Sequence, residues 1–339
     1  MKKIGKPMDE NRPQRKTTDL VGIDFSTTAT KVVRLKKTKE GISLMGIDLL
    51  PAVDLGLPSQ RLELPRNMVA HYGCLAYSAP SAIVRMVNAP LAGEETTIPD
   101  AKLRELLNVD TDYRVSTQLV KKGKGRQDSS FLAAAIPVDD VRFLLNMFPS
   151  GPPAPASVEV SGLSFVSAFL HAHGAECANE AVCLIEAGES VSHFAFLNKG
   201  MVALVGKFSS GGGMLRRKVV EDLGVDDELA GTILTDHSIN ISTTLLDVMS
   251  PFLKQLSISR DFIERHQGCR ISKTYVSGGV SLLPHWSVVV EQELHTRVVP
   301  WNPLANIQYE PDILPDELAG QTTRFAAAIG AAIGGLGES

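Results

Sequence analysis

The stretch VGIDFSTTATKVVRL, which begins at Val21, carries the pattern on which the fold prediction rests. It opens with apolar and β-branched residues that are typical of a buried strand, and it then breaks into a turn of small polar residues. From Lys31 to Leu35 an alternating apolar run follows, so the stretch predicts a β-hairpin with a polar tip. Such a tip directs consecutive backbone N–H groups to one side of a tight loop, where they form a cradle for phosphate oxygens.

Two later stretches carry related patterns. CLIEAGESVSHFAFL, from Cys183, repeats the strand, the small polar turn and the returning strand, whereas TYVSGGVSLLPHW, from Thr274, ends its strand in a Ser-Gly-Gly turn. Asp24 and Glu186 occupy the same place in the two hairpins. The hairpins lie about 160 residues apart and the Ser-Gly-Gly turn about 90 residues further on, and both spacings are the size of a domain. This order predicts one nucleotide pocket assembled from three distant segments.

These motifs resemble those of the actin-like ATPase superfamily, in which two duplicated domains each contribute a phosphate hairpin. GIDFSTTATK resembles the phosphate-1 motif, EAGESVSH the phosphate-2 motif and VSGGVSLLPH the adenosine motif. The resemblance implies an actin-like (ribonuclease H-like) α/β fold, with two duplicated α/β domains around a nucleotide cleft and a smaller subdomain in each. The implied first half covers residues 19–175, with a subdomain at about 89–150, and the implied second half covers residues 176–339, with a subdomain at about 212–266.

Within the superfamily the chain is most similar to the PilM family of type IV pilus assembly, and next to the division protein FtsA. The likeness follows the order of segments from Asp19 onward, including SAIVRMVNAP, FLAAAIPVDDVRFLLNMF, SVEVSGLSF, GMVALVGKFSSGGGML, PFLKQLSISRDFI and WNPL. It implies a cytoplasmic ATP-binding scaffold that partners recruit to the inner membrane. By resemblance, such a scaffold binds the short N-terminal tail of a PilN-like inner-membrane protein. It thereby links the membrane complex to the motor of a pilus or related secretion machine, and self-association is a further option.

Departures from the family pattern bear on hydrolysis and on the partner groove. Ser26 stands where these families carry glycine in the first hairpin, and a side chain there crowds a phosphate-contacting N–H. Glu186 stands where most members carry aspartate, which is one methylene shorter. The segment LRELLNVDTDYRV lacks the acidic and aromatic run of its counterpart. We therefore predict nucleotide binding with at most a weak ATPase activity.

The predicted cofactors are ATP and Mg²⁺. Asp24 and Glu186 are expected to face each other across the cleft and to hold Mg²⁺ through waters, with Glu189 as an alternative acid, because Mg²⁺ gives up its hydration reluctantly. Lys31 is the expected donor to the phosphates. Further nucleotide contacts are expected from the two tips and from two glycine turns, at Ser26, Thr27, Thr28, Gly188, Glu189, Ser190, Gly212, Gly213, Ser277, Gly278 and Gly279.

Each of these assignments has a plain structural alternative. Lys31 could be a strand-edge lysine in solvent, each acid could cap its own turn, and the Ser-Gly-Gly segment could be an ordinary strand-to-helix turn. Glu159, on the expected first connecting helix, is the candidate catalytic residue, placed to orient an attacking water. These alternatives are open at the level of the sequence.

Composition bounds the class of protein. The 339 residues exceed one ordinary core, and 44% hydrophobic with 21% charged residues is typical of a globular protein in water. A net charge of −4 gives no reason to expect a nucleic-acid partner. No apolar run reaches the roughly 18 residues that a membrane span requires. Residues 1–18 are basic and rich in helix breakers, so they predict a disordered tail rather than a secretory signal.

The segments between the motifs outline further elements. Residues 19–50 predict three strands, and residues 74–88 predict a strand pair. PSGPPAPAS reads as a linker between subdomains, and a helix is expected over residues 158–172. Helices within residues 213–266 are expected to form the smaller lobe of the second half.

Other functions fit the same fold. The chain could be a degenerate scaffold that kept the fold and lost ATP, or a filament former like FtsA. It could also be an actin-fold small-molecule kinase, but such enzymes usually present a catalytic aspartate near the connection between the halves. Only Glu159 and Glu176 stand in that stretch.

Overall fold

The computed structural model describes residues 17–53, 60–78, 81–91, 96–123, 127–149 and 151–337. The first sheet contains the hairpin that the sequence predicted at Val21. Its first three strands form an antiparallel meander, and two later strands join parallel to the first. In spatial order the strands are β14 (Ile307–Gln308), β3 (Ile42–Pro51), β2 (Ala29–Lys37), β1 (Asp19–Phe25), β4 (Tyr72–Tyr77) and β8 (Ala154–Val160). The three strands predicted for residues 19–50 are confirmed.

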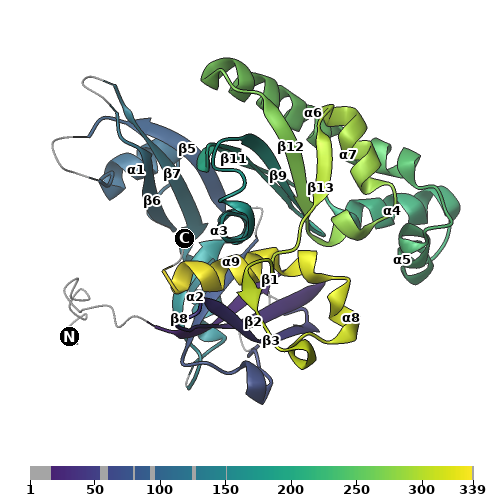
Figure 1. Cartoon of the computed structure of the whole chain (residues 1–339), viewed down its shortest axis with the longest axis horizontal. Coiled ribbons are helices and arrows are strands. Elements are labelled where there is room, and N and C mark those ends of the chain that lie inside the picture. The colour runs from purple at the N-terminus through teal and green to yellow at the C-terminus, as the bar shows by residue number, and fades with distance from the viewer. Residues whose placement is uncertain are drawn as a thin grey trace.

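The second sheet repeats this construction around the second hairpin. Here too an antiparallel meander comes first, and the next two strands join parallel on the other side of its first strand. In spatial order the strands are β11 (Met201–Phe208), β10 (Ser192–Asn198), β9 (Ala181–Ala187), β12 (Ile271–Ser277) and β13 (Arg297–Pro300). Because the two sheets share one strand order, the fold contains two copies of the same α/β unit, as the motifs predicted (Figure 1).

A third, small sheet is inserted between β4 and β8. It consists of β5 (Ile83–Ala89), β7 (Ser129–Pro137) and β6 (Tyr113–Lys121), with the helices α1 (Asp100–Leu107) and α2 (Val138–Asn146). The strand pair predicted over residues 74–88 is wrong, because its two strands enter different sheets: β4 lies between β1 and β8, and β5 pairs with β7. The small sheet lies beside β11 in Figure 1, and the Lys207 ammonium donates to the Ala82 carbonyl between them.

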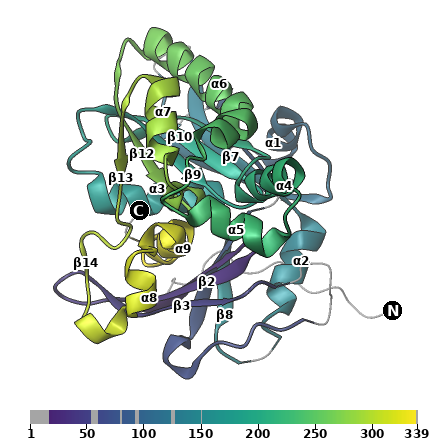
Figure 2. The same cartoon turned by 90° about the vertical axis from the view of Figure 1, so that its right-hand side faces the viewer.

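Helices fill the interval between β11 and β12, where the sequence predicted them. They are α4 (Gly212–Leu223), α5 (Asp227–Thr235) and the long α6 (Ser242–Gln267). After β12 come the short 3₁₀ turn η2 (Gly279–Leu282) and the helix α7 (Trp286–Leu294). Figure 2 shows these helices gathered above the first sheet. Among the residues that the structure describes, none of the helices combines the length and the apolar character that crossing a bilayer needs.

Two central helices, α3 (Ser161–His173) and α9 (Ala326–Gly335), pack closely against each other. A Cβ added at Gly330 of α9 would lie 1.6 Å from the Ser164 carbonyl oxygen, so glycine is required for this contact. Although α9 follows the second sheet in sequence, it covers the first sheet, and a Cβ added at Gly22 of β1 would lie 2.0 Å from the Ala328 carbonyl oxygen. The two sheets and both helices therefore share one hydrophobic core.

The start of α3 corrects two predictions. The helix begins at Ser161 rather than at residue 158, because Val158 to Val160 continue the pairing of β8 with β4. The segment read as a linker is likewise part of this strand from Ala154 onward. Pairing with β4 therefore extends through the Pro- and Ala-rich part of this segment.

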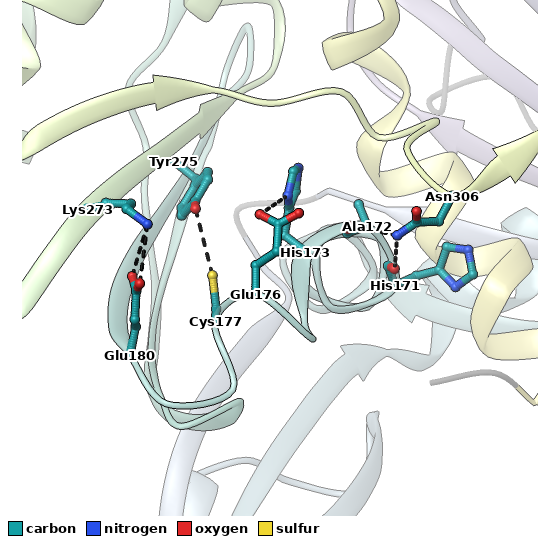
Figure 3. A network of polar contacts seen from close by, with 9 residues as sticks. All are labelled: His171, Ala172, His173, Glu176, Cys177, Glu180, Lys273, Tyr275 and Asn306. Atoms are coloured by element: carbon teal, nitrogen blue, oxygen red, sulfur yellow. Dashed lines mark hydrogen bonds and ion pairs between the residues drawn. The ribbon is translucent and has the colours of Figure 1, made fainter.

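The chain passes between the two sheets twice, after α3 and after β13, and the two crossings are tied together (Figure 3). The Asn306 amide donates to the carbonyl oxygens of His171 and Ala172 at the end of α3, at 3.3 and 2.9 Å. The Cys177 thiol of the first crossing donates to the Tyr275 hydroxyl of β12 at 3.7 Å. The predicted boundary at residues 175 and 176 falls in the first crossing, and the division into halves and subdomains stays a prediction.

Candidate functional site

A cavity of about 490 Å³ opens where the two hairpin tips, the start of α3 and the turn after β12 converge. Segments from both halves of the chain therefore line one space, which is the arrangement that the spacing of the motifs predicted. The predicted residues that line it are Asp24, Ser26, Thr28, Lys31, Glu186, Gly188, Glu189, Ser190, Gly212, Gly278 and Gly279.

The first hairpin places an acid and a base side by side. Asp24 and Lys31 stand opposite each other in the register of β1 and β2, and the Lys31 Nζ lies 3.1 Å from the Asp24 Oδ2. The Ser161 hydroxyl, at the start of α3, donates to the other oxygen of Asp24 at 2.9 Å. Both charged side chains are buried, so each is held by the other rather than by bulk water.

Ser26 has a role within the first hairpin. Its hydroxyl donates to the Ala29 carbonyl at 2.8 Å and accepts from the Lys31 ammonium at 2.5 Å. The side chain is thereby turned back into the turn, and it holds the ammonium group at the mouth of the cavity. Whether it also crowds a phosphate stays a prediction.

The second hairpin repeats the pairing with different residues. Glu186 and His193 stand opposite each other in the register of β9 and β10, and the Glu186 Oε2 lies 3.6 Å from the His193 Nδ1. Burial raises the pKa of the Glu186 carboxyl, whereas the hydrogen bond with His193 lowers it. The imidazole fits under α3 because a Cβ at Gly162 would lie 2.4 Å from its Cδ2.

Two glycine turns let backbone approach backbone at the second tip. The Gly212 N–H donates to the Gly188 carbonyl at 3.0 Å and the Gly213 N–H donates to the Glu189 carbonyl at 2.9 Å, so the start of α4 is fixed to the tip. Gly278 has a φ of +85°, and a Cβ there would lie 2.4 Å from the Ala187 carbonyl oxygen. These glycines let the start of α4 and the turn after β12 pack directly against the second tip.

The start of α3 also faces the cavity. No side chain from the described part of the chain caps this helix, whose first residue, Ser161, lines the cavity. The first N–H groups of a helix carry a partial positive charge and are common binding groups for phosphate. This helix therefore adds an anion-attracting element to the two tips.

Four predicted residues lie outside the cavity lining. Thr27 is exposed at the tip, and Gly213 lies behind Gly212. Ser277 is buried in β12, where its hydroxyl donates to the Ile185 carbonyl at 3.4 Å. The Glu159 carboxylate accepts from Ser157 and Ser164, at 3.2 and 2.9 Å, and it lies beside α9 rather than in the cleft.

The sequence reasoning missed several lining residues. His193 follows Glu186 by the same interval that separates Lys31 from Asp24, and this repeated spacing could have identified it. Ser161 is two residues past Glu159, on the other side of the strand-to-helix junction. The remaining polar ones come from segments with no motif of their own, and they include Ser78, Arg216, Thr235, Gln321 and Arg324.

The residues present fit a magnesium nucleotide. Gly279 lines the cavity with open space around its Cβ position, and the cavity size suits a ligand of this kind. Two carboxylates, from Asp24 and Glu186, line the cavity from its two halves. Within the described ranges no group of three or more His, Cys, Asp or Glu side chains could hold a metal ion by itself. A Mg²⁺ ion here would keep several waters and bind through the phosphates.

The duplicated sheets, the shared helices α3 and α9 and the cleft between two hairpin tips together define a protein of the actin-like ATPase fold. The chain belongs to the family described as "Type IV pilus assembly protein PilM", which matches residues 155–335, more than half of the chain. The likeness to FtsA inferred from the sequence stays a prediction.

Solved structures share the fold at low sequence identity. The "PilM-PilN type IV pilus biogenesis complex" is similar over 94% of this chain and 98% of that chain, with 16% identity and a TM-score of 0.76. More distant likenesses include MreB 5 of Spiroplasma citri bound to AMPPNP (10% identity, 94% and 96% covered, TM-score 0.47). Another is the ethanolamine utilization protein EutJ from Carboxydothermus hydrogenoformans (14% identity, 92% and 88% covered, TM-score 0.45). No curated protein matches the sequence.

Proposed function

We propose that the protein binds ATP with Mg²⁺ in the cleft and acts as a PilM-type scaffold of a type IV pilus or related secretion machine. The observation that carries the nucleotide part is the 490 Å³ cavity, which two hairpin tips, the start of α3 and a glycine turn line together. The phosphates would lie between the tips, near Lys31 and the start of α3. Mg²⁺ would neutralise phosphate charge beside Asp24 and Glu186. The adenosine would extend toward Gly278 and Gly279.

A substitution at Gly279 tests directly whether ATP binds in the cavity. A Cβ added there meets no atom within 4 Å, and the residue lines the cavity, so a side chain would extend into the cavity without striking the protein. We expect Gly279→Val to weaken Mg·ATP binding by more than about 2 kcal/mol, roughly thirtyfold, in a calorimetric titration. Gly320→Val is the matched control, because Gly320 also has open space around its Cβ position and lies outside the cavity.

Three results would contradict the nucleotide part of the proposal. The first is unchanged ATP affinity in Gly279→Val when the circular dichroism spectra of both variants match the parent protein. The second is the absence of ATP binding by the parent protein itself, which would favour the degenerate scaffold. Equal losses in Gly279→Val and Gly320→Val would also contradict it, because only one of the two side chains reaches the cavity.

The partner part of the proposal rests on family membership and on the presence of PilN in the similar complex. The partner would be the short N-terminal cytoplasmic tail of a PilN-like inner-membrane protein, which would recruit this protein to the membrane and link it to the motor. A fluorescent peptide with that tail sequence should bind saturably to the full chain in an anisotropy titration. Binding no tighter than that of a scrambled peptide, with and without Mg·ATP, would refute this part.

A further inference from the structure

Glu189 places a carboxylate inside the proposed nucleotide cavity, at the start of α4. A Cβ built at Gly212 would lie 2.6 Å from the Glu189 Oε2, and one built at Gly213 would lie 3.2 Å from its Oε1. The carboxylate therefore rests against the first turn of a twelve-residue helix. Negative charge is favoured at this end of a helix, and phosphate is the anion that proteins most often bind there.

Arg216 of α4 holds this carboxylate in place. Its Nη2 lies 3.1 Å from the Glu189 Oε1, and its Nη1 lies 3.2 Å from the Oδ2 of Asp227 at the start of α5. The Arg216 Nε is buried and has no hydrogen-bond partner in the described part of the chain. Arg216 lines the cavity and Asp227 does not. The guanidinium thus joins one acid inside the cavity to one acid outside it.

A second guanidinium, that of Arg324, interacts electrostatically with the Glu189 carboxylate. Arg324 lines the cavity near the segment that leads into α9, and burial lowers the pKa of its guanidinium, whereas the charge of Glu189 raises it. Lys31, the third cation of the lining, already faces Asp24. Two of these three cations therefore have a carboxylate within ion-pair distance, and the third lies in the field of one, before any ligand enters.

We propose that Glu189 is an internal competitor of the nucleotide phosphates, holding the Arg216 guanidinium beside the start of α4 when the cavity is empty. This inference rests on the proposed nucleotide function. Entry of a polyphosphate brings negative charge toward the Glu189 carboxylate, so the carboxylate must give up its place or repel the ligand. Glu189 therefore sets the affinity of the cleft, and it does so in proportion to the phosphate charge of the ligand.

The test compares two acids that share one arginine. Mg·ATP, Mg·ADP and adenosine are titrated into the parent protein, Glu189→Gln and Asp227→Asn at one ionic strength. Glu189→Gln keeps the shape of the side chain. We expect it to raise the affinity for ATP roughly tenfold, the affinity for ADP by a smaller factor, and the affinity for adenosine by less than about twofold. Asp227→Asn removes a charge from the same guanidinium outside the cavity, so its ATP affinity should stay within about twofold of the parent value.

The Arg216→Gln background shows whether the arginine mediates the effect. The gain from Glu189→Gln should shrink in that background, because the cation that the phosphates would take over is gone. A parent protein that binds ATP while Glu189→Gln binds it equally or more weakly overturns the inference and leaves the proposed function standing. In that case the carboxylate contacts the ligand rather than competing with it. Absence of ATP binding by all variants overturns both.

Discussion

At the scale of single residues, each of the two hairpins pairs an acid with a basic side chain, and the side chains differ between the hairpins. Asp24 faces Lys31 on the first, and Glu186 faces His193 on the second, at the same register position. Burial has the largest effect on the Glu186 carboxyl and raises its pKa, whereas the hydrogen bond with His193 and the charge of His193 lower it.

Glu159 provides a pH-dependent prediction at the same scale. Burial raises the pKa of its carboxyl, and the hydrogen bonds from Ser164 and Ser157 lower it. Because the folded-state pKa lies above the unfolded value, the free energy of unfolding falls as pH rises from the unfolded pKa through the folded one. Glu159→Gln removes this loss, so its stability should exceed that of the parent protein more at about pH 8 than at about pH 4.

Urea unfolding at the two pH values measures this difference. The same variant should bind Mg·ATP with unchanged affinity, because the carboxylate lies beside α9 and outside the cavity lining. A stability difference that shrinks with rising pH would contradict the inferred burial effect. Loss of ATP binding would instead indicate that Glu159 contributes to the nucleotide site.

At the scale of elements, the contact between α3 and α9 depends on the absence of a side chain. A methyl group at Gly330 would overlap the Ser164 carbonyl oxygen, and α9 could not rest on α3 without moving. Because α9 also covers β1, the displacement would expose part of the first sheet. Small residues in AAAIGAAIGGL are therefore a packing requirement.

Two glycine-to-alanine variants separate this steric effect from helix propensity. Gly330→Ala should lower the free energy of unfolding by about 3 kcal/mol or more through overpacking. Gly231→Ala, in the interior of α5, meets no atom within 4 Å and should raise it by about 0.5–1 kcal/mol through backbone entropy. Denaturant titration measures both. A Gly330→Ala protein as stable as the parent would show that the two helices are further apart than described.

At the scale of the whole molecule, elements from each half of the sequence pack on the sheet of the other half. The helix α9 and the strand β14 come late in the sequence and complete the first sheet, whereas α3 comes from the first half and contacts the second sheet. One core cluster therefore contains Leu20 of β1, Phe165 of α3 and Leu184 of β9. The cleft lies between units that share a core, so a ligand that binds both tips acts on the packing of both.

The sequence by itself determined the parts that are local. Alternating apolar residues followed by small polar turns predicted both hairpins, and the acids at matching positions, Asp24 and Glu186, both line one cavity. Periodicity and turn chemistry act over a few residues, so they can be recognised from the sequence without a structure. The resemblance of these motifs and of their order to those of the actin-like ATPase superfamily implied the duplicated actin-like fold.

Tertiary structure alone decided which side chains face the cleft and which strands share a sheet. Arg216 and Arg324 reach the cavity from helical segments without a motif, and Ser161 rather than Glu159 lines it because the strand β8 continues to Val160. The return of β14 and α9 to the first sheet likewise has no local signal. These outcomes depend on burial between segments that lie far apart in the chain, and such burial is settled only when the whole molecule packs.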